Sequence, residues 1–294
     1  MLKNLDNGIL FMLASALISA LNGALTKMLT QEMPALEVVF FRNVLGLFII
    51  LYALKHTPPK LTGGKIHLLF TRGLFGFLAM ILFFYTIGII PLGEAITLNK
   101  TSPFFVTILA FFLLGERLRM RTLIALLVGF SGVVLISKPF GMSFSYIHIL
   151  GVLGGFFAAA AYTTIKKIKD IYDSRVIVLS FVTVGSFLPA LLFMVAPYVN
   201  APTTLEFLFP RFVFPETLSI YLLIGFMALI STLSQWLLTK AYSAKNLSIV
   251  GVISYTNIPF AIGFGWFLGD SFPDTLTFMG IVLIVIGGVL VSRK

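Results

Sequence analysis

The chain has 294 residues, of which 59% are hydrophobic and only 11% are charged. A soluble domain carries about 25% charged residues because its exterior must be solvated, and a disordered chain combines low hydrophobicity with high charge. Both classes are excluded, so we expect an integral membrane protein in contact with the lipid bilayer. The net charge of +10 is typical of cytoplasmic membrane loops, so nucleic acid is not expected as a partner. The chain has no cysteine, which excludes disulfides, thiolate metal sites and a Cys nucleophile.

Ten apolar stretches follow one another along the chain, and the first begins close to Met1 without a signal-peptide cleavage site. They cover approximately residues 8–28, 35–54, 66–88, 92–114, 122–138, 147–165, 176–197, 217–239, 247–268 and 276–292. Their lengths suit helices that cross a hydrocarbon core about 30 Å thick. We therefore predict an all-α protein with ten transmembrane helices. The one long connection, Tyr198–Glu216, contains three prolines and is expected at the membrane interface.

The distribution of basic residues predicts the orientation. If the N-terminus is inside, 16 Lys and Arg residues lie on inner loops and tails, and only Lys27, Lys138 and Arg211 lie outside. The inner set includes Arg72, which we place at the margin of the first inner loop. Because Lys and Arg resist translocation, both termini are predicted to be cytoplasmic.

The second half of the sequence repeats features of the first. The matching pairs are Leu114-Gly115-Glu116 with Leu268-Gly269-Asp270, Gly132–Lys138 with Gly287–Arg293, and Pro103 with Pro259. They predict two five-helix repeats, residues 1–140 and 141–294. Because five is odd, the second repeat is inverted relative to the first. Inverted repeats of this kind are typical of alternating-access carriers.

This pattern resembles the EamA-type drug/metabolite transporter superfamily. The resemblance rests on Gly115-Glu116 closing the fourth helix, Pro103 within it, and Gly129 and Gly132 in the fifth. A second stretch, Leu238-Thr239-Lys240-Ala241-Tyr242 followed by Tyr255, resembles the bacterial members that carry S-adenosylmethionine. The superfamily resemblance implies a central cavity lined by the first, third, fourth, sixth, eighth and ninth helices. It also implies substrates that range over amino acids, nucleotide-related metabolites and drugs.

Pro103 and Pro259 lie near the middle of the predicted fourth and ninth helices. A proline inside a helix leaves the carbonyl four residues earlier unpaired, and here these carbonyls belong to Asn99 and Tyr255. Matching broken helices in two halves of a carrier point to the transport site. The alternative is that both prolines only bend their helices, with the carbonyls satisfied by Ser or Thr.

Two cations are predicted to lie inside the membrane. Arg42 and Lys100 are each about eight residues from the outer end of a helix, where a cation costs up to about 2.5–3.5 kcal/mol. Arg42 either ties helices together or contacts the ligand. Lys100 either binds the substrate, pairs with Glu94 or Glu37, or extends to the outer surface. Glu94 and Glu37 are in turn possible proton-coupling groups, or interfacial acids that balance nearby cations.

Other polar and aromatic side chains on the presumed cavity helices are candidate substrate contacts. They are Asn22, Asn99, Tyr162, Gln235, Trp236, Tyr255 and Asn257. The amides join helices or contact the ligand, and Trp236 and Tyr255 could stack on a flat or cationic ligand. The three histidines are far apart in sequence, so no metal is expected. We find no Walker motif and no nucleophile elbow, and we expect neither a cofactor nor an enzyme.

These features together predict a secondary carrier in the cell inner membrane that moves a small polar metabolite by alternating access. The excess of embedded cations over acids favours an anionic or zwitterionic substrate. A membrane-embedded lipid-modifying enzyme and a channel are the alternatives. A homodimer through the apolar fifth and tenth helices is left open.

Overall fold

The computed structural model describes residues 7–59, 63–114, 120–137, 145–243 and 253–292. Within these ranges the chain is helical and contains no strand. The helices in chain order are α1 (Asn7–Glu32), α2 (Ala35–His56), α3 (Ile66–Ile89), α4 (Leu92–Asn99), α5 (Ser102–Leu114), α6 (Met120–Ser137), α7 (Tyr146–Ile168), α8 (Ser174–Val195), α9 (Leu218–Tyr242), α11 (Asn257–Phe267) and α12 (Thr275–Ser292). Three short 3-10 helices are η2 (Ala196–Tyr198), η3 (Glu206–Leu208) and η4 (Ser254–Thr256).

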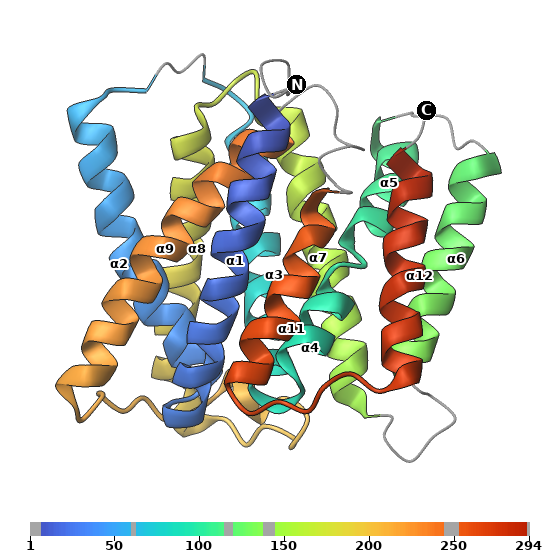
Figure 1. The fold of residues 1–294 in the computed structure, drawn as a ribbon. Coiled ribbons are helices and arrows are strands. Elements are labelled where there is room, and N and C mark those ends of the chain that lie inside the picture. Colours follow the sequence, from blue (N-terminus) through green and yellow to red (C-terminus); the bar gives the residue numbers. More distant parts are fainter. Residues whose placement is uncertain (1–6, 60–62, 115–119, 138–144, 244–252, 293–294) are drawn as a thin grey trace.

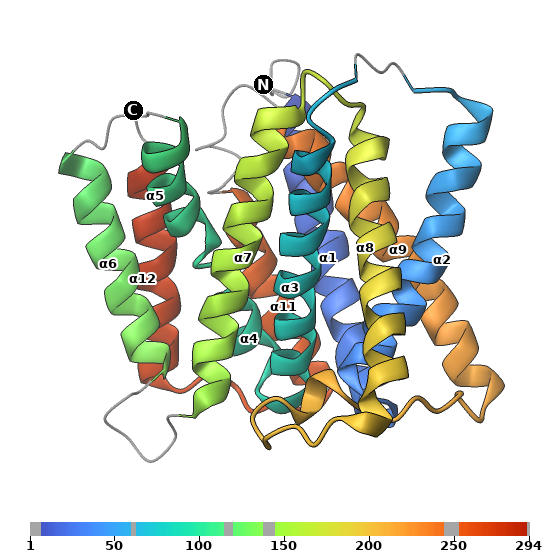
Figure 2. The same ribbon diagram turned by 180° about the vertical axis from the view of Figure 1, so that it is seen from behind.

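Seven segments of the described chain are long and apolar enough to cross a membrane, and α4 and α5 together form one of them. The helices stand side by side as a bundle, with α6 and α12 as a separate pair at one edge (Figures 1 and 2). α1 begins and α12 ends at the same side of the bundle, which is the upper side in Figure 1. The all-helical membrane architecture expected from the apolar stretches is therefore present.

The contacts between helices recur in pairs. α1 packs on α9 and α3 packs on α7, while α2 contacts α8, α4 contacts α11 and α6 contacts α12. The α6–α12 contact is close because Gly132 and Gly280 bring the two backbones together. A Cβ at Gly132 would lie 2.6 Å from the carbonyl oxygen of Gly280, and a Cβ at Gly280 would lie 2.7 Å from that of Gly132.

The fourth predicted helix is interrupted close to its proline. α4 ends at Asn99, α5 begins at Ser102, and Pro103 is the second residue of α5. Pro259 is likewise the third residue of α11. Pro103 lies near the middle of the apolar span Leu92–Leu113, directly after its break. The start of the predicted ninth helix, before residue 253, lies outside the described residues. Pro103 lies in the first turn of α5, where the missing N–H has no helical partner to lose. Pro259 follows η4 within a helical run that continues from residue 253 to Phe267.

The two carbonyls that the prolines were expected to leave unpaired have defined surroundings. The carbonyl of Tyr255 accepts the backbone N–H of Asn257 at the junction of η4 and α11. The carbonyl of Asn99 lies against α7, where a Cβ on Gly155 would be 3.1 Å from its oxygen. The absence of a side chain at Gly155 thus allows α7 to pack directly on the break between α4 and α5.

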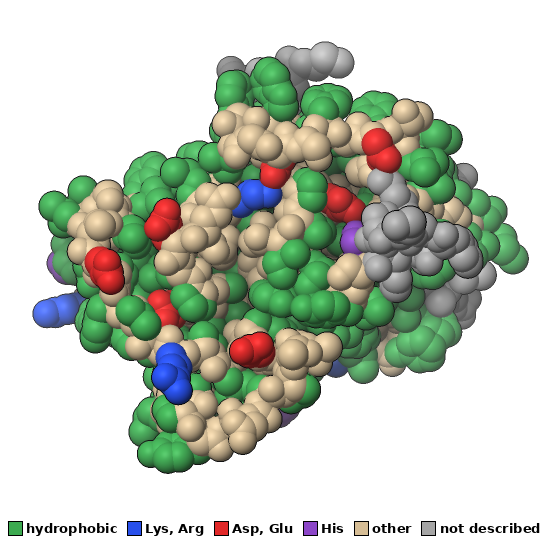
Figure 3. All heavy atoms as spheres, turned by 90° about the horizontal axis from the view of Figure 1, so that it is seen from below, with side chains coloured by type: hydrophobic (Ala, Val, Ile, Leu, Met, Phe, Trp, Pro, Cys, Tyr) green, Lys and Arg blue, Asp and Glu red, His purple; other side chains and the backbone are tan. Residues whose placement is uncertain are grey.

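An ion pair and hydrogen bonds to acidic side chains connect the helices at the lower end of the bundle. The connection between α8 and α9 runs along this end (Figure 1), and Glu37 of α2 accepts the N–H of Val213 in it at 2.9 Å. Asp270, between α11 and α12, pairs with Lys27 of α1 and accepts the N–H of Leu92 at 2.8 Å. Asp and Glu side chains are scattered over this lower face (Figure 3). The interactions of Asp270 join three helices that lie far apart in the sequence.

Candidate functional site

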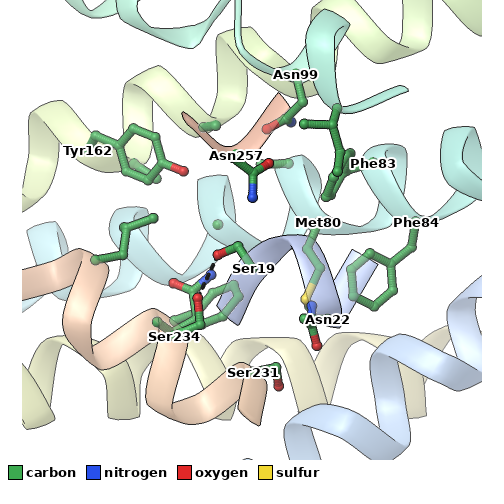
Figure 4. Close-up of a pocket in the computed structure, with 18 of the residues that line it drawn as sticks. Ser19, Asn22, Met80, Phe83, Phe84, Asn99, Tyr162, Ser231, Ser234 and Asn257 are labelled. Carbon is green, nitrogen blue, oxygen red and sulfur yellow. Dashed lines mark hydrogen bonds between the residues drawn. The ribbon is translucent and has the colours of Figure 1, made fainter. Parts of the chain in front are cut away.

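A cavity of about 820 Å³, a volume that includes its open mouth, lies among the central helices. Side chains from α1, α3, α4, α7, α9 and α11 line it, as does Lys100 directly after α4. These six helices correspond to the first, third, fourth, sixth, eighth and ninth predicted transmembrane helices, which are the ones that the family resemblance implies. α2 and α8 also contribute, through Arg42 and Phe181. Figure 4 shows that Ser19, Asn99, Tyr162 and Asn257 point toward a common space.

Most of the predicted substrate contacts lie together in this cavity. Those that line it are Asn22, Arg42, Asn99, Lys100, Tyr162, Gln235 and Asn257. Trp236 and Tyr255 are not among the lining residues. The ammonium nitrogen of Lys240 instead lies over the ring of Trp236, 3.9 Å from its centroid. Tyr255 packs in an apolar cluster with Ile258. Both residues were placed on suitable helices, but their side chains face other neighbours.

Arg72 is the most informative residue that sequence reasoning misplaced. It was assigned to the margin of an inner loop, but it lies in α3, is only 1% exposed and lines the cavity. Gly76, one turn further along α3, makes the space, because a Cβ there would collide with the Arg72 guanidinium and the Phe181 ring. An Arg followed four residues later by Gly on one helix face was the available signal.

The two arginines share one aromatic ring. The guanidinium carbon of Arg42 is 5.2 Å from the centroid of the Phe181 ring, and that of Arg72 is 4.9 Å from the same centroid. Arg42 also donates to the side-chain oxygen of Asn43 at 2.9 Å. In the described part of the chain, neither guanidinium has a carboxylate partner. A cation–π contact is worth about 2 kcal/mol when desolvated, which offsets only part of the cost of burying a cation.

Lys100 also lacks the acidic partners that were considered for it. Glu94 is 3.1 Å from Nε2 of His148, and Glu37 accepts the N–H of Val213. Neither acid lines the cavity. Across the described residues, the cavity wall holds three cationic side chains, Arg42, Arg72 and Lys100, and no Asp or Glu. In a medium of low dielectric constant, this unbalanced positive charge attracts an anion.

Several polar atoms in the wall have no hydrogen-bond partner. Five buried side-chain atoms in the described chain are in this state, and four belong to cavity residues: Oδ1 of Asn22, Nε of Arg42, Nε of Arg72 and Oε1 of Gln235. An unpaired buried polar atom costs about 1–3 kcal/mol. Four of the five such atoms thus belong to residues that line one cavity.

The wall formed by α1, α9 and α11 is polar but uncharged. The hydroxyls of Ser19 and Ser234 are 2.6 Å apart (Figure 4). The side-chain amide of Asn257 donates to the carbonyl of Ala16 at 2.6 Å. These bonds tie α1 to the other two helices. They also keep hydroxyl and amide groups in the lining of the cavity.

The two acids considered for proton coupling, Glu94 and Glu37, do not line the cavity. Glu94 and Glu37 lie near the lower ends of α4 and α2, where they join structural elements. Lys27, which these acids were expected to balance, pairs with Asp270 instead. No group of three or more metal-ligating side chains occurs among the described residues.

Similarity to known proteins extends over almost the whole chain. Residues 6–138 match the EamA-like transporter family. The chain is 33% identical to the pseudopaline exporter CntI of Pseudomonas aeruginosa, over 98% of this chain and 97% of that protein. It is 28% identical to the S-adenosylmethionine uptake transporter of Rickettsia bellii, over 97% and 92%. A solved crystal structure, 19% identical, shares the fold with a TM-score of 0.63 over 96% of this chain and 95% of its own.

The relatives are named as transporters rather than enzymes, and one is an exporter while another is an uptake protein. The resemblance seen in the sequence, including the likeness to the S-adenosylmethionine transporters, is therefore confirmed. The protein is a transporter and a multi-pass protein of the bacterial inner membrane. The chain belongs to the EamA-like transporter family.

Proposed function

We propose that the protein is a secondary carrier that moves a small polar metabolite, anionic or zwitterionic, through the central cavity by alternating access. The observation that carries this proposal is the set of buried polar atoms on cavity-lining residues that lack hydrogen-bond partners. Three of these atoms belong to Asn22, Arg42 and Gln235, which the sequence predicted as substrate contacts. Proteins keep such costly groups where function requires them. A bound metabolite would supply the missing partners.

The helix contacts support an inverted repeat of residues 1–140 and 141–294. Exchanging the two halves relates α1 to α7 and α3 to α9, so the α1–α9 contact corresponds to the α7–α3 contact. The same exchange relates α4 to the region of α11 and α6 to α12, and each of these pairs is in mutual contact. A carrier built from two inverted repeats can open its site to either side by moving one half against the other.

Both ends of the cavity carry contacts that would have to break in turn. At the lower end, Asp270 joins Lys27 and the start of α4. At the upper end, Met12, Ile165, Leu238 and Tyr242 belong to one buried apolar cluster. We infer that the upper end is cytoplasmic, with both termini on that side and ten transmembrane helices, because the basic loops predicted from the sequence lie there.

The test is flux into proteoliposomes that contain the purified protein. Anionic and zwitterionic metabolites, including amino acids and nucleotide-related compounds, would each be supplied in labelled form. We expect saturable uptake of at least one anionic or zwitterionic class. Absence of saturable flux for every class would refute the proposal. Unitary currents in bilayer recordings would favour the channel, and turnover of lipid by the purified protein would favour the enzyme.

A further inference from the structure

We propose that the central cavity is built for a metabolite with at least two separated carboxylates and an amine or hydroxyl donor. This inference rests on the proposed transport function and specifies its substrate class. It follows from the chemistry of the cavity wall, which holds three cations without an acid and both donors and acceptors that lack partners.

The first subsite consists of Arg42, Arg72 and Phe181. The two guanidinium groups are held against one ring, at 5.2 and 4.9 Å from its centroid, and each has an Nε atom without a partner. Arg42 and Arg72 are 3% and 1% exposed, so solvent does not compensate their charge. A guanidinium presents a rigid fork of N–H donors that matches a carboxylate. This subsite therefore fits one carboxylate.

The second subsite is Lys100, at the break between α4 and α5. Lys100 lines the cavity, whereas the cations over the Phe181 ring are Arg42 and Arg72. The arginines and Phe181 belong to α2, α3 and α8, which pack on one another, whereas α4 packs mainly on α7 and α11 and less extensively on α3. The positive charge thus comes from two parts of the fold, α2 with α3 and the break between α4 and α5, which favours two separated anionic groups over one phosphate carrying both charges.

The third region is the uncharged wall of α1 and α9. The unpaired atoms there are acceptors, Oδ1 of Asn22 and Oε1 of Gln235, and Ser231 and Ser234 lie beside them in the lining. Acceptors without donors require a ligand that brings N–H or O–H groups. An amine or hydroxyl on the metabolite would satisfy them.

Charge balance points in the same direction. A zwitterion with one carboxylate brings no net charge and leaves the three lining cations unbalanced. Each carboxylate in excess of the amine removes one unit of this imbalance. Because uncompensated charge in a low-dielectric site is costly, the cavity favours a metabolite whose acidic groups outnumber its amines.

The experiment combines deletion of a charge from the protein with deletion of a carboxylate from the ligand. Kd values would be measured by ligand-induced thermal stabilisation of the purified full-length protein. The probes are glutamate, glutarate, 4-aminobutyrate and phosphoserine, and the variants are Lys100→Gln and Arg72→Gln. Lys55→Gln is the matched control, because Lys55 is exposed at the end of α2. Circular dichroism and size-exclusion chromatography would establish that each variant is folded.

For the unmodified protein we expect glutamate to bind most tightly and at least tenfold more tightly than 4-aminobutyrate. In Lys100→Gln this ratio should fall to within about threefold, because the second carboxylate has lost its partner. If Lys100 had a purely structural role, the variant would bind all the probes more weakly by the same factor. The ratio of Kd values would then be unchanged, and this result would overturn the inference. So would tighter binding of 4-aminobutyrate or phosphoserine than of glutamate, or no binding of either dicarboxylate.

Failure of this inference is distinguishable from failure of the proposed function. Saturable flux of another metabolite class, without dicarboxylate binding, would overturn the substrate class and leave the carrier function standing. Absence of flux for every class would overturn the carrier function itself.

Discussion

Replacing Lys100 by Met should stabilise the ligand-free protein. The Lys100 ammonium group lies in the cavity wall, and no acid among the described residues pairs with it. A cation near the centre of a membrane helix costs about 2.5–3.5 kcal/mol. Met keeps most of the length of the side chain and removes the charge. We therefore expect the free energy of unfolding to rise by about 2 kcal/mol, somewhat less than the full cost because the cavity is partly polar.

The assay is thermal unfolding of the purified protein in detergent, followed by tryptophan fluorescence. Lys100→Met should have a Tm several degrees above that of the unmodified protein and should lose saturable transport. Lys55→Met, which alters an exposed lysine, should leave both unchanged, since surface substitutions usually stay within about 0.5 kcal/mol. A lower Tm for Lys100→Met would show that the ammonium stabilises the empty protein, and it would refute the reasoning.

Three further predictions concern the surroundings of the cavity. Asp270→Asn removes the ion pair with Lys27 and should speed thiol labelling of a Ser231→Cys reporter from the lower side several-fold. An unchanged labelling rate would contradict the idea that this ion pair closes the lower end of the cavity. Gly155→Leu should lower flux at least tenfold without preventing insertion, because its side chain would displace the α4–α5 break, and normal flux would show that the break tolerates movement. Asp173 lies outside the membrane helices, and its hydrogen bond with Arg175 holds the pKa of the carboxyl below its usual value of 3.8. The stability that it contributes is therefore present above this value and is lost as the pH falls through the lowered pKa. Asp173→Asn should flatten the dependence of Tm on pH below about pH 4, and an equally steep dependence in this variant would contradict that assignment.

The sequence predicted the all-helical membrane architecture because apolar length is a local property. The polar lining was also largely predictable, since a polar side chain such as Asn22 or Gln235 in hydrocarbon needs a reason to be there. Trp236 shows the limit of this reasoning. Its helix was assigned correctly, but the face that a side chain presents depends on helices distant in sequence, and all faces of a membrane helix can be apolar.

Arg72 was misplaced for a different reason. Counting positive residues near helix ends cannot distinguish an arginine that stays in a loop from one that turns inward. Only Gly76, which leaves room for the guanidinium, marks the difference, and its effect depends on Phe181 of another helix. The pairing of Lys27 with Asp270 could not be predicted either, because these residues are 243 positions apart and meet only through packing.

The most direct test of the central claim is whether a transported metabolite occupies the cavity. Because the natural chain has no cysteine, a single Ser231→Cys substitution places one thiol in the cavity lining. The rate of alkylation would be measured with and without a saturating concentration of the metabolite that shows saturable flux, with Lys55→Cys as the exposed control. We predict at least tenfold slower labelling of Ser231→Cys when the metabolite is present, and no change at position 55. An unchanged rate at position 231 while transport is saturated would contradict the claim that this cavity is the substrate site.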